Sequence, residues 1–582
     1  MTPSKTFLMA WAAAQVSVVL TAASVQAGTG WNSLQAGNPV IPGYFADPCS
    51  RKFGDTYYLY VTPDGWDVGR GPAGVWSSKD YVHWAWQPMN WPKTEFKWAP
   101  SVVKFKDNYY MYNSVPCQIW AAVSDTPVGP WTNLMGENGK EMIPDQTPKG
   151  TIVLDGEAFI DDDESVYLWY STWWRPTVAK LKPDMRTFDG DPIQYFKHAD
   201  LQDPPKGLVQ RCMEGPYMFK RKGTYYLMYS DDMCQDSTYN VKYSTSKSPT
   251  GPFEYDPAKN PILETTDDDT VDGPGHHSML VEGDRVYIVY HRHDNPHDPD
   301  GAHRQTCISE LYFNQDGSIE KVQPGHLGVG YLAPSTKRDF NLALGKTATA
   351  SSCLSPDFKP EYAVDANNGT LWKAAGQNYP QWLQVDLGKA SPVRRIETEF
   401  QYPQVANRYL IEHSTDGKTW KTFADRKDNK TPGIMIDQGD VQARYVRITL
   451  MGQDSGRPDQ WAALWGFNVY DGIDKPNQAP VVDLGPEQNL NFRFPAFTIE
   501  GAVHDDGLPN GPVKVQWSKV SGPGNVAFAH SDRCRTGVTV DQAGQYVLKL
   551  TADDGQLKGE GKLTVNMAPP TDRVIAYDFD DD

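Results

Sequence analysis

Three acidic residues occupy matching places in a repeated part of the chain. Asp47, Asp155 and Glu214 each stand eleven or twelve residues before a tyrosine of a motif that recurs along the sequence. Carboxylates that crowd together repel one another when all are ionised, so one of them is held protonated and can act as a general acid. Cleavage of a glycosidic bond needs one such acid and one ionised carboxylate. The spacing therefore indicates glycoside hydrolysis if the fold brings the three acids together.

The recurring motif is a short aromatic strand that occurs five times. Its copies read DTYYLYVT (55–62), DNYYMYNS (107–114), ESVYLWYS (164–171), GTYYLMYS (223–230) and DRVYIVYH (284–291). Most copies follow a polar turn and a shorter apolar run, which is the pattern of a β-hairpin. A period of about 50–60 residues with four strands is typical of a β-propeller. We therefore predict an all-β protein whose first domain, residues 28–338, is a five-bladed β-propeller.

The first strand of each blade lines the central channel of a propeller, so residues at one distance before the motif should share one level. Eleven or twelve residues before the motif tyrosine, the second blade has Trp98 and the fifth has His276. A flat indole ring at that level can stack on the apolar face of a sugar. A calcium site built from clustered carboxylates is the alternative for the same hub, and the tryptophan beside the acids favours sugar chemistry.

A set of motifs within roughly residues 38–335 resembles glycoside hydrolase family 43. The motifs are FADP, WAPS, LDGEAFIDDD, MEGPYMFKRKGTYYLMYS, GPGHHSMLVEGDRVYIVYH and SSKDYVHW. The resemblance implies a five-bladed inverting enzyme in which Asp47 is the general base and Glu214 the general acid. By the same resemblance, Asp155 raises the pKa of the acid and orients it.

The resemblance also implies supporting residues around the acids. His276, with His277 as the less favoured choice, matches a hub histidine that neighbours a calcium or sodium ion, and Arg304 matches an arginine that faces the substrate. The sequence departs from the family pattern at Ser101, where WAPD is common, and at Gly156, where Asp-Pro is common. Neither departure removes a catalytic carboxylate.

One histidine-rich segment stands apart from these motifs. YHRHDNPHDPDGAH (290–303) contains His291, His293, His297 and His303. We favour a polar loop over the channel mouth for this segment, with a metal site as the alternative. The chain has no nucleophilic-serine, phosphate-loop or dinucleotide-binding motif, so we expect no organic cofactor.

The N-terminus and the charge bear on location and partners. Residues 1–27 are predicted to be a signal peptide, because Lys5 precedes an apolar run and small residues precede a cleavage point after Ala27. An uncleaved anchor is the alternative. A net charge of −18 argues against nucleic acid and anionic membrane surfaces. We expect a secreted or periplasmic monomer without membrane contact after cleavage.

Two further β domains are predicted after the propeller. Residues 339–473 contain NLALGKTATASS, AVDANNGTLWKAAGQNYPQWLQVDLGK and ARYVRITL, and they resemble the discoidin-like fold of carbohydrate-binding modules of family 32. That resemblance implies a structural calcium ion. Residues 474–568, which begin with the linker DKPNQAP, read as an immunoglobulin-like sandwich. Residues 569–582 form an acidic tail.

The sequence as a whole predicts an exported, inverting exo-glycosidase that acts on plant-type polysaccharide. The resemblance favours release of terminal α-L-arabinofuranose, then β-D-xylose, then β-D-galactofuranose. The alternatives are an endo-arabinanase and a glycan-binding propeller that has lost catalysis. The segment TPDGWDVGRGPAG (62–74) is long enough to close one end of the channel, which favours the exo enzyme.

Overall fold

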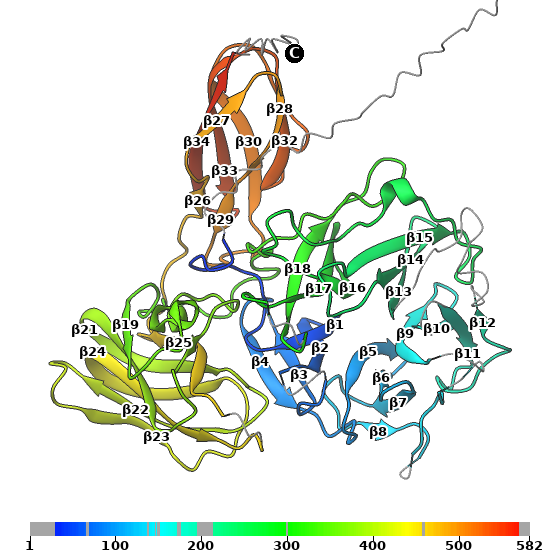
Figure 1. The fold of residues 1–582 in the computed structure, drawn as a ribbon, viewed down its shortest axis with the longest axis horizontal. Helices are drawn as coiled ribbons and strands as arrows, with labels where there is room; N and C mark the ends of the chain where they lie inside the picture. Colours follow the sequence, from blue (N-terminus) through cyan, green and yellow to red (C-terminus); the bar gives the residue numbers. More distant parts are fainter. Residues whose placement is uncertain are drawn as a thin grey trace, which may run out of the picture.

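The structure is a computed structural model in which nearly every regular element is a β-strand (Figure 1). It describes residues 30–65, 69–136, 139–145, 147, 152–171, 176–194, 214–297, 301–456 and 460–569. The predicted signal peptide and most of the predicted tail lie outside these residues. Within them, no helix is both long and apolar enough to cross a membrane.

The first eighteen strands form five antiparallel sheets of consecutive strands. The first three sheets have four strands each: β1 (Phe45–Phe53), β2 (Thr56–Pro63), β3 (Gly74–Ser78) and β4 (Trp84–Pro88); β5 (Trp98–Phe105), β6 (Asn108–Ser114), β7 (Ile119–Ser124) and β8 (Thr132–Asn133); β9 (Leu154–Ile160), β10 (Val166–Ser171), β11 (Thr177–Leu181) and β12 (Ile193–Gln194). The aromatic motif forms the second strand of every sheet.

The fourth and fifth sheets have three strands each, where the sequence pattern predicts four. They are β13 (Glu214–Arg221), β14 (Thr224–Asp231) and β15 (Asn240–Ser246), and β16 (Gly275–Glu282), β17 (Arg285–His293) and β18 (Arg304–Leu311). Beyond β15, the described chain pairs with that strand only at isolated bridges, such as Val241 with Leu263. Beside β18, the N-terminal segment forms hydrogen bonds in place of a fourth strand. For example, Val40 N donates to Thr306 O at 2.9 Å.

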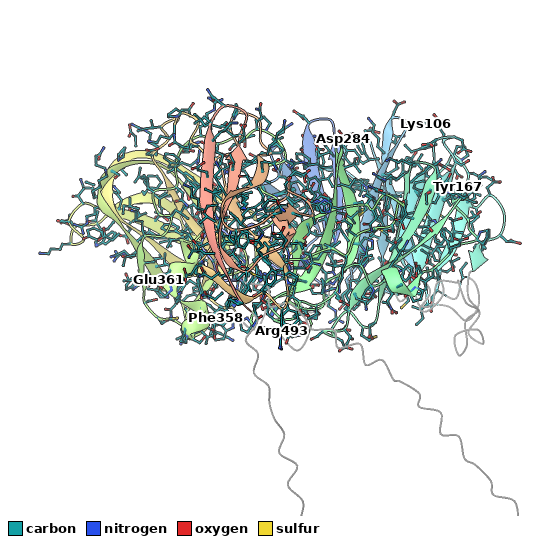
Figure 2. All side chains as sticks on the ribbon, turned by 90° about the horizontal axis from the view of Figure 1, so that it is seen from above. Lys106, Tyr167, Asp284, Phe358, Glu361 and Arg493 are labelled. Atoms are coloured by element: carbon teal, nitrogen blue, oxygen red, sulfur yellow. The ribbon has the colours of Figure 1, made fainter. Side chains whose placement is uncertain are left out.

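Buried side chains between neighbouring sheets close the five sheets into a ring. Five hydrophobic clusters each draw on two neighbouring sheets, and one of them joins the fifth sheet to the first through Tyr57, Trp76, Leu280 and Val289. Alternate residues of a strand point to opposite faces, so the aromatic motif fills the spaces on both sides of its sheet. The turns that carry Lys106 and Asp284 lie at one end of the ring (Figure 2), and the bulges described below lie at the other end of the same hairpins.

The second domain is a seven-stranded sheet around its own core. Its strands are β19 (Thr347–Ala350), β20 (Trp372–Lys373), β21 (Gln381–Phe400), β22 (Asn407–Ser414), β23 (Lys421–Arg426), β24 (Met435–Gln453) and β25 (Ala463–Tyr470). Two 3-10 helices, η3 (Pro356–Phe358) and η4 (Pro360–Ala363), precede β20, and η2 (Pro257–Lys259) belongs to the ring. Trp372 is fully buried in the core.

The third domain contains sheets of four, three and two strands that share one core around Trp517. Its strands are β26 (Val481–Asp483), β27 (Gln488–Asn491), β28 (Ala496–Glu500), β29 (Ala502–His504), β30 (Lys514–Ser521), β31 (Val526–Phe528), β32 (Arg535–Val540), β33 (Gly544–Asp553) and β34 (Lys558–Ala568).

Both C-terminal domains contact the ring. Asn367 of the second domain donates to the carbonyl oxygens of Trp31 and Ser33 at 2.8 and 3.0 Å, and Arg533 of the third pairs with Glu320 at 2.8 Å. A cavity of about 1310 Å³ lies where the three domains meet, and the three predicted catalytic acids do not line it.

Candidate active site

A β-bulge at the same place in each of the five first strands builds the site. The residues at the bulges have left-handed backbone angles: Asp47 (φ 50°), Ala99 (φ 44°), Asp155 (φ 56°), Gly215 (φ 60°) and His276 (φ 36°). In each sheet the register between the first two strands shifts across that residue. Bulges redirect side chains and cluster near active sites, and left-handed backbone costs a non-glycine residue about 1–3 kcal/mol. Four such strained residues around one axis indicate a functional centre.

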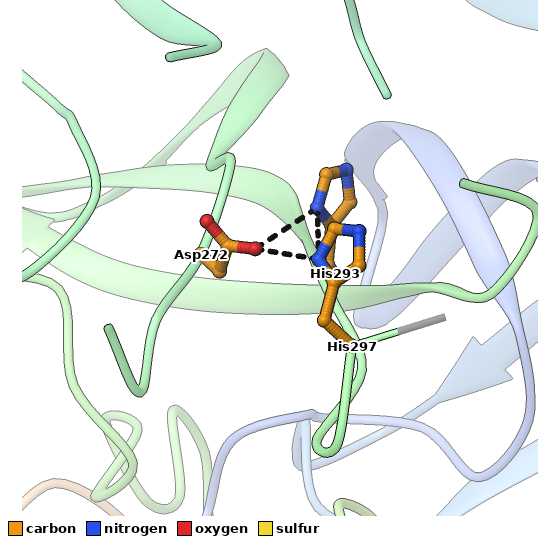
Figure 3. A group of neighbouring side chains, drawn as sticks. All are labelled: Asp272, His293 and His297. Carbon is orange, nitrogen blue, oxygen red and sulfur yellow. Dashed lines mark hydrogen bonds and ion pairs between the residues drawn. The ribbon is translucent and has the colours of Figure 1, made fainter. Parts of the chain in front are cut away.

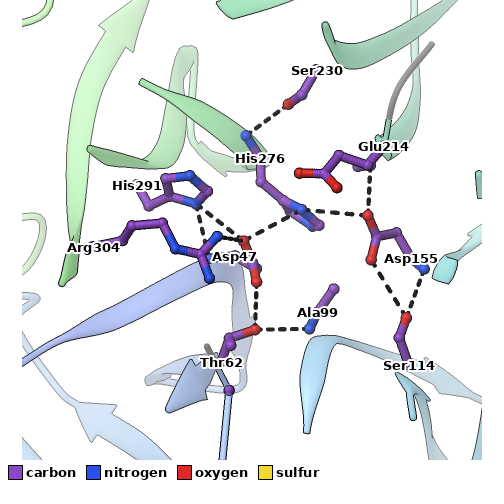
Figure 4. Close-up of polar contacts among 12 residues, drawn as sticks. Asp47, Thr62, Ala99, Ser114, Asp155, Glu214, Ser230, His276, His291 and Arg304 are labelled. Atoms are coloured by element: carbon purple, nitrogen blue, oxygen red, sulfur yellow. Dashed lines mark hydrogen bonds and ion pairs between the residues drawn. The ribbon is translucent and has the colours of Figure 1, made fainter. Parts of the chain in front are cut away.

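The last residue of the aromatic motif links four of the five bulges to the neighbouring sheet. The amide of a bulge residue donates to a side chain of the preceding sheet in four pairs: Ala99 N to Thr62 Oγ1 (2.8 Å), Asp155 N to Ser114 Oγ (2.7 Å), His276 N to Ser230 Oγ (2.7 Å) and Asp47 N to His291 Nδ1 (3.2 Å). The fifth amide, of Gly215, donates to Asp155 Oδ2 at 3.0 Å. Inter-sheet hydrogen bonds therefore run around the hub and fix the acids relative to one another (Figure 4).

Asp47 is a buried carboxylate that is held in its ionised form. Thr62 Oγ1 donates to its Oδ2 at 2.6 Å, and Arg304 Nη1 donates to its Oδ1 at 3.1 Å. Burial acts to raise the pKa of Asp47, but Arg304, His276 and His291 together outweigh it and place the pKa well below its ordinary value. An ionised carboxylate at neutral pH is what a general base for water requires.

Asp155 and Glu214 are held closer to their protonated forms. The pKa of Asp155 is raised to about 7. Burial is the largest cause, the charge of His276 opposes the rise, and the charges of Glu214 and Asp47 add to it. Burial also raises the pKa of Glu214, while His276 and the hydroxyl of Tyr239 oppose the rise. Tyr239 donates to Glu214 Oε1 at 2.6 Å. The pKa values of both carboxyl groups are therefore raised, so the pair can hold one proton.

His276 lies between the acids, as the sequence predicts. Its Nδ1 is 3.5 Å from Asp47 Oδ1 and 3.7 Å from Asp155 Oδ2, and the carboxyl group of Glu214 lies beside it in Figure 4. Burial lowers the pKa of His276, but the three acids outweigh burial and raise it above its usual value. A cationic imidazole here offsets part of the repulsion among the acids.

Arg304 is placed differently from the expectation that it faces the substrate. Its side chain is only 3% exposed, and its Nε and Nη2 bind both oxygens of Asp64, at 2.8 and 3.2 Å, while Nη1 binds Asp47. This position makes Arg304 a positioning residue for Asp47, because a guanidinium held at both ends has little freedom to reach a sugar. Direct contact with the substrate stays a prediction.

Asp64 and Tyr239 belong to the site although the sequence did not single them out. Asp64 is fully buried, and burial raises its pKa to about 7 against the opposing charge of Arg304. Both residues lie in segments that follow the second strand of a sheet, at the bulge end of the ring. The Thr, Ser or His that ends four of the motif copies was the sequence signal for the hub hydrogen bonds.

Trp98 begins β5 one residue before the bulge at Ala99. Its side chain is partly exposed, and its ring meets that of Phe96 edge-on at 5.2 Å. Gly69 packs directly against the indole, because a Cβ atom at Gly69 would lie 2.1 Å from Trp98 Cδ1. The predicted stacking residue therefore lies at the rim of the hub, and its sugar contact stays a prediction.

Comparison with known proteins agrees with this geometry. Residues 36–319 match Glycosyl hydrolases family 43, and residues 347–465 match the F5/8 type C domain. The chain is 34% identical over 312 residues to a beta-D-galactofuranosidase of Aspergillus niger, covering 50% of this chain and 86% of the relative. It is 25% identical over 312 residues to an extracellular exo-alpha-(1->5)-L-arabinofuranosidase of Cellvibrio japonicus, covering 48% of this chain and 81% of that protein.

A solved structure described as a glycoside hydrolase is also similar, with 31% identity and a TM-score of 0.64, and the alignment covers 76% of this chain and 100% of that one. The chain belongs to glycosyl hydrolase family 43 and is a glycoside hydrolase with a discoidin-like second domain.

Proposed function

We propose that this protein is an exported, inverting exo-glycosidase that releases a terminal α-L-arabinofuranose, β-D-xylose or β-D-galactofuranose from plant-type polysaccharide. The observation that carries the proposal is the contrast between two carboxyl groups beside His276. The pKa of Asp47 lies well below its usual range, whereas that of Glu214 is raised. Two carboxyl groups with pKa values driven apart mark the base and the acid of a glycosidase.

In the proposed reaction Asp47 removes a proton from a water molecule, and the water oxygen attacks the anomeric carbon. Glu214 gives its proton to the glycosidic oxygen, so the bond to the leaving sugar breaks without forming a free alkoxide. Asp155, fixed by Ser114 and the amide of Gly215, would orient Glu214. Burial and the negative charge of Asp47 raise the pKa of Glu214. Arg304 and Thr62 hold the base in place.

Release of a terminal sugar is supported by hydrogen bonds that join loops at the bulge end of the ring, where they would close one side of the site. Gly65 N donates to Ala302 O at 2.8 Å, and Lys97 N donates to Gly69 O at 2.9 Å. These bonds tie the segment after β2 to the segment after β17 and to the approach to β5. The relatives named above act on galactofuranosides and arabinofuranosides, which supports a furanose as the released sugar. Endo-arabinanase activity and glycan binding without catalysis remain the alternatives to be tested.

The remaining domain assignments are part of the proposal. Each sheet of the ring would be one blade of a five-bladed propeller, with domain limits of 28–338, 339–473 and 474–568. The discoidin-like domain would hold carbohydrate near the hub, since Tyr44, which stacks on His303 at 4.1 Å, also meets Trp465 at 5.3 Å. The third domain would be an immunoglobulin-like spacer. We propose a monomer that is secreted or periplasmic.

Two places fit the calcium or sodium ions predicted from the sequence. A hub cavity of about 20 Å³ is lined by residues that include Ser101, Glu157 and His277, which is room for one water or one small ion. Both ring nitrogens of His277 are buried, with no hydrogen-bond partner among the described residues, whereas His276 Nδ1 faces the acids. His277 therefore fits an ion neighbour better than His276, and the ion would offset nearby negative charge.

In the discoidin-like domain, Asp365 fits a cation. Burial raises the pKa of Asp365 to about 8, against the hydrogen bonds that it accepts from Thr370 and Asn367. A bound calcium ion would supply the positive charge that stabilises this carboxylate.

Initial rates on three aryl glycosides test the class and the sugar together. We expect the protein to release 4-nitrophenol from one of the α-L-arabinofuranoside, β-D-xyloside and β-D-galactofuranoside much faster than from the other two. The reason is that a site closed on one side fits a single ring shape. Release of oligosaccharides alone from arabinan would favour the endo enzyme. Binding of arabinan or arabinogalactan without any product would overturn the catalytic proposal.

A further inference from the structure

Three potential metal ligands that are not among the catalytic acids converge at the fifth sheet. Figure 3 shows them. Asp272 precedes β16, His293 ends β17, and His297 follows it. Asp272 Oδ2 is 3.4 Å from His293 Nδ1 and 2.5 Å from His297 Nδ1, and the two Nδ1 atoms are 2.8 Å apart. Asp272 and His293 are buried, and His297 is partly exposed.

The hydrogen bond on the far side of His293 sets the state of its ring. Nε2 lies 2.9 Å from the carbonyl oxygen of Cys234, and a carbonyl oxygen only accepts, so Nε2 carries the proton. In the neutral ring Nδ1 is then a bare lone pair. Histidines that bind metals usually donate their other N–H to a backbone carbonyl or a carboxylate in this way.

The lone pair of His293 faces an oxygen of Asp272 at 3.4 Å, and two acceptors this close need a hydrogen-bond donor or a cation between them. A proton on His297 is one bridge, and a metal ion is the other. Metal–ligand distances of about 2.0–2.1 Å at a tetrahedral zinc centre place neighbouring ligand atoms about 3.3 Å apart. Asp272 Oδ2 and His293 Nδ1 already have that separation. His297 stands closer than this, at 2.5 and 2.8 Å, so it would have to move outward to bind the same ion. It lies in the connection after β17.

We infer that Asp272, His293 and His297 bind a divalent transition-metal ion of the zinc class. Two imidazole nitrogens and one carboxylate oxygen suit zinc, nickel or cobalt better than calcium, which prefers a shell of oxygen ligands. Water would supply the fourth ligand through the exposed side of His297. The sequence alone favoured a polar loop for this segment, because the spacing of its histidines did not reveal that Asp272 joins them.

The proposed ion has a structural role. It would join the segment before β16 to the segment after β17, and His293 extends the link to Cys234 in the connection between β14 and β15. The same connection ends near Tyr239, which donates to Glu214. The site would thus hold three connections at the active-site end of the ring in a fixed relation.

Calorimetric titration of zinc sulfate into the full-length, chelator-treated protein tests the inference, with excess calcium present to fill sites that prefer calcium. We expect one equivalent to bind, and we expect His297→Ala and His293→Gln each to weaken binding at least about 100-fold. His303→Gln is the matched control, because His303 lies in the same segment and faces another carboxylate, Asp294, at 3.6 Å. It should bind zinc as the wild type does.

A cobalt titration of the unaltered protein gives a second readout that needs no variant. We expect visible absorption bands of a low-coordinate cobalt centre, and a zinc-dependent rise in melting temperature that His297→Ala abolishes. Absence of stoichiometric binding of both metals would overturn the inference and leave a proton on His297 as the bridge. Equal affinity in the wild type and in both ligand variants would overturn it as well.

Discussion

Asp47→Asn is expected to reduce kcat about 10²–10⁴-fold on every glycoside substrate, whatever its leaving group. An amide keeps the shape of the side chain and can still accept the hydroxyl of Thr62, but it cannot take a proton from water. Because attack by water is needed for all substrates of an inverting enzyme, a better leaving group cannot restore the rate. Initial rates on the best aryl glycoside and on the natural glycan measure the loss.

Asp64→Asn is the matched control for Asp47→Asn. Both residues bind Arg304, so both substitutions replace a carboxyl group beside the same guanidinium. Only Asp47 is proposed to contact the attacking water, and we expect Asp64→Asn to lose much less activity. Melting temperatures of the two variants separate misfolding from lost chemistry. A rate near that of the wild type in Asp47→Asn would move the base to another residue.

Glu214→Gln is expected to separate substrates by their leaving groups. We expect a loss of about 10²–10⁴-fold on natural glycan, whose leaving oxygen needs a proton, and a much smaller loss on a 2,4-dinitrophenyl glycoside. Substrate should still bind, since the amide keeps an acceptor for Tyr239. Rates on the two substrates with one enzyme preparation make the comparison independent of protein concentration.

The pH dependence of kcat/KM tests the role of Glu214 in a second way. Glu214 must be protonated to act as an acid, and its pKa is raised, so wild-type kcat/KM should fall as the pH rises through that pKa. Asp47 must be ionised, and its low pKa keeps the base active well into the acidic range. Glu214→Gln should lack the alkaline fall on the activated substrate. Equal losses on both substrates, or full activity on natural glycan, would contradict the role of Glu214.

The repeat spacing was sufficient to predict which acids lie near one another. It located the bulge positions only to within one residue. The bulge residues of the second and fourth sheets are Ala99 and Gly215, one place after the predicted Trp98 and Glu214. Successive residues of a strand face opposite sides, so an offset of one normally turns a side chain away. Glu214 still reaches the hub because the bulge at Gly215 interrupts that alternation.

Contacts between distant segments could not be predicted from spacing. Arg304 and Asp64 are 240 positions apart, and neither belongs to the part of the repeat that sets the phase. Asp272 and His293 come from different segments, and their meeting depends on how the chain folds around β16. The ring of sheets could be predicted from the aromatic motif because its pattern is local and repeated. Each of these polar contacts occurs once, so no repeat reveals it.

The configuration of the first-formed sugar tests the central claim most directly, since it reports whether water attacks opposite the leaving group. Proton NMR of the anomeric signal during hydrolysis of the best aryl glycoside follows it before mutarotation. An Asp47 that activates water opposite Glu214 predicts a product of inverted configuration, which needs carboxyl groups about 6.5–9.5 Å apart. A product of retained configuration would contradict the claim, because it would require a covalent intermediate on one of these acids.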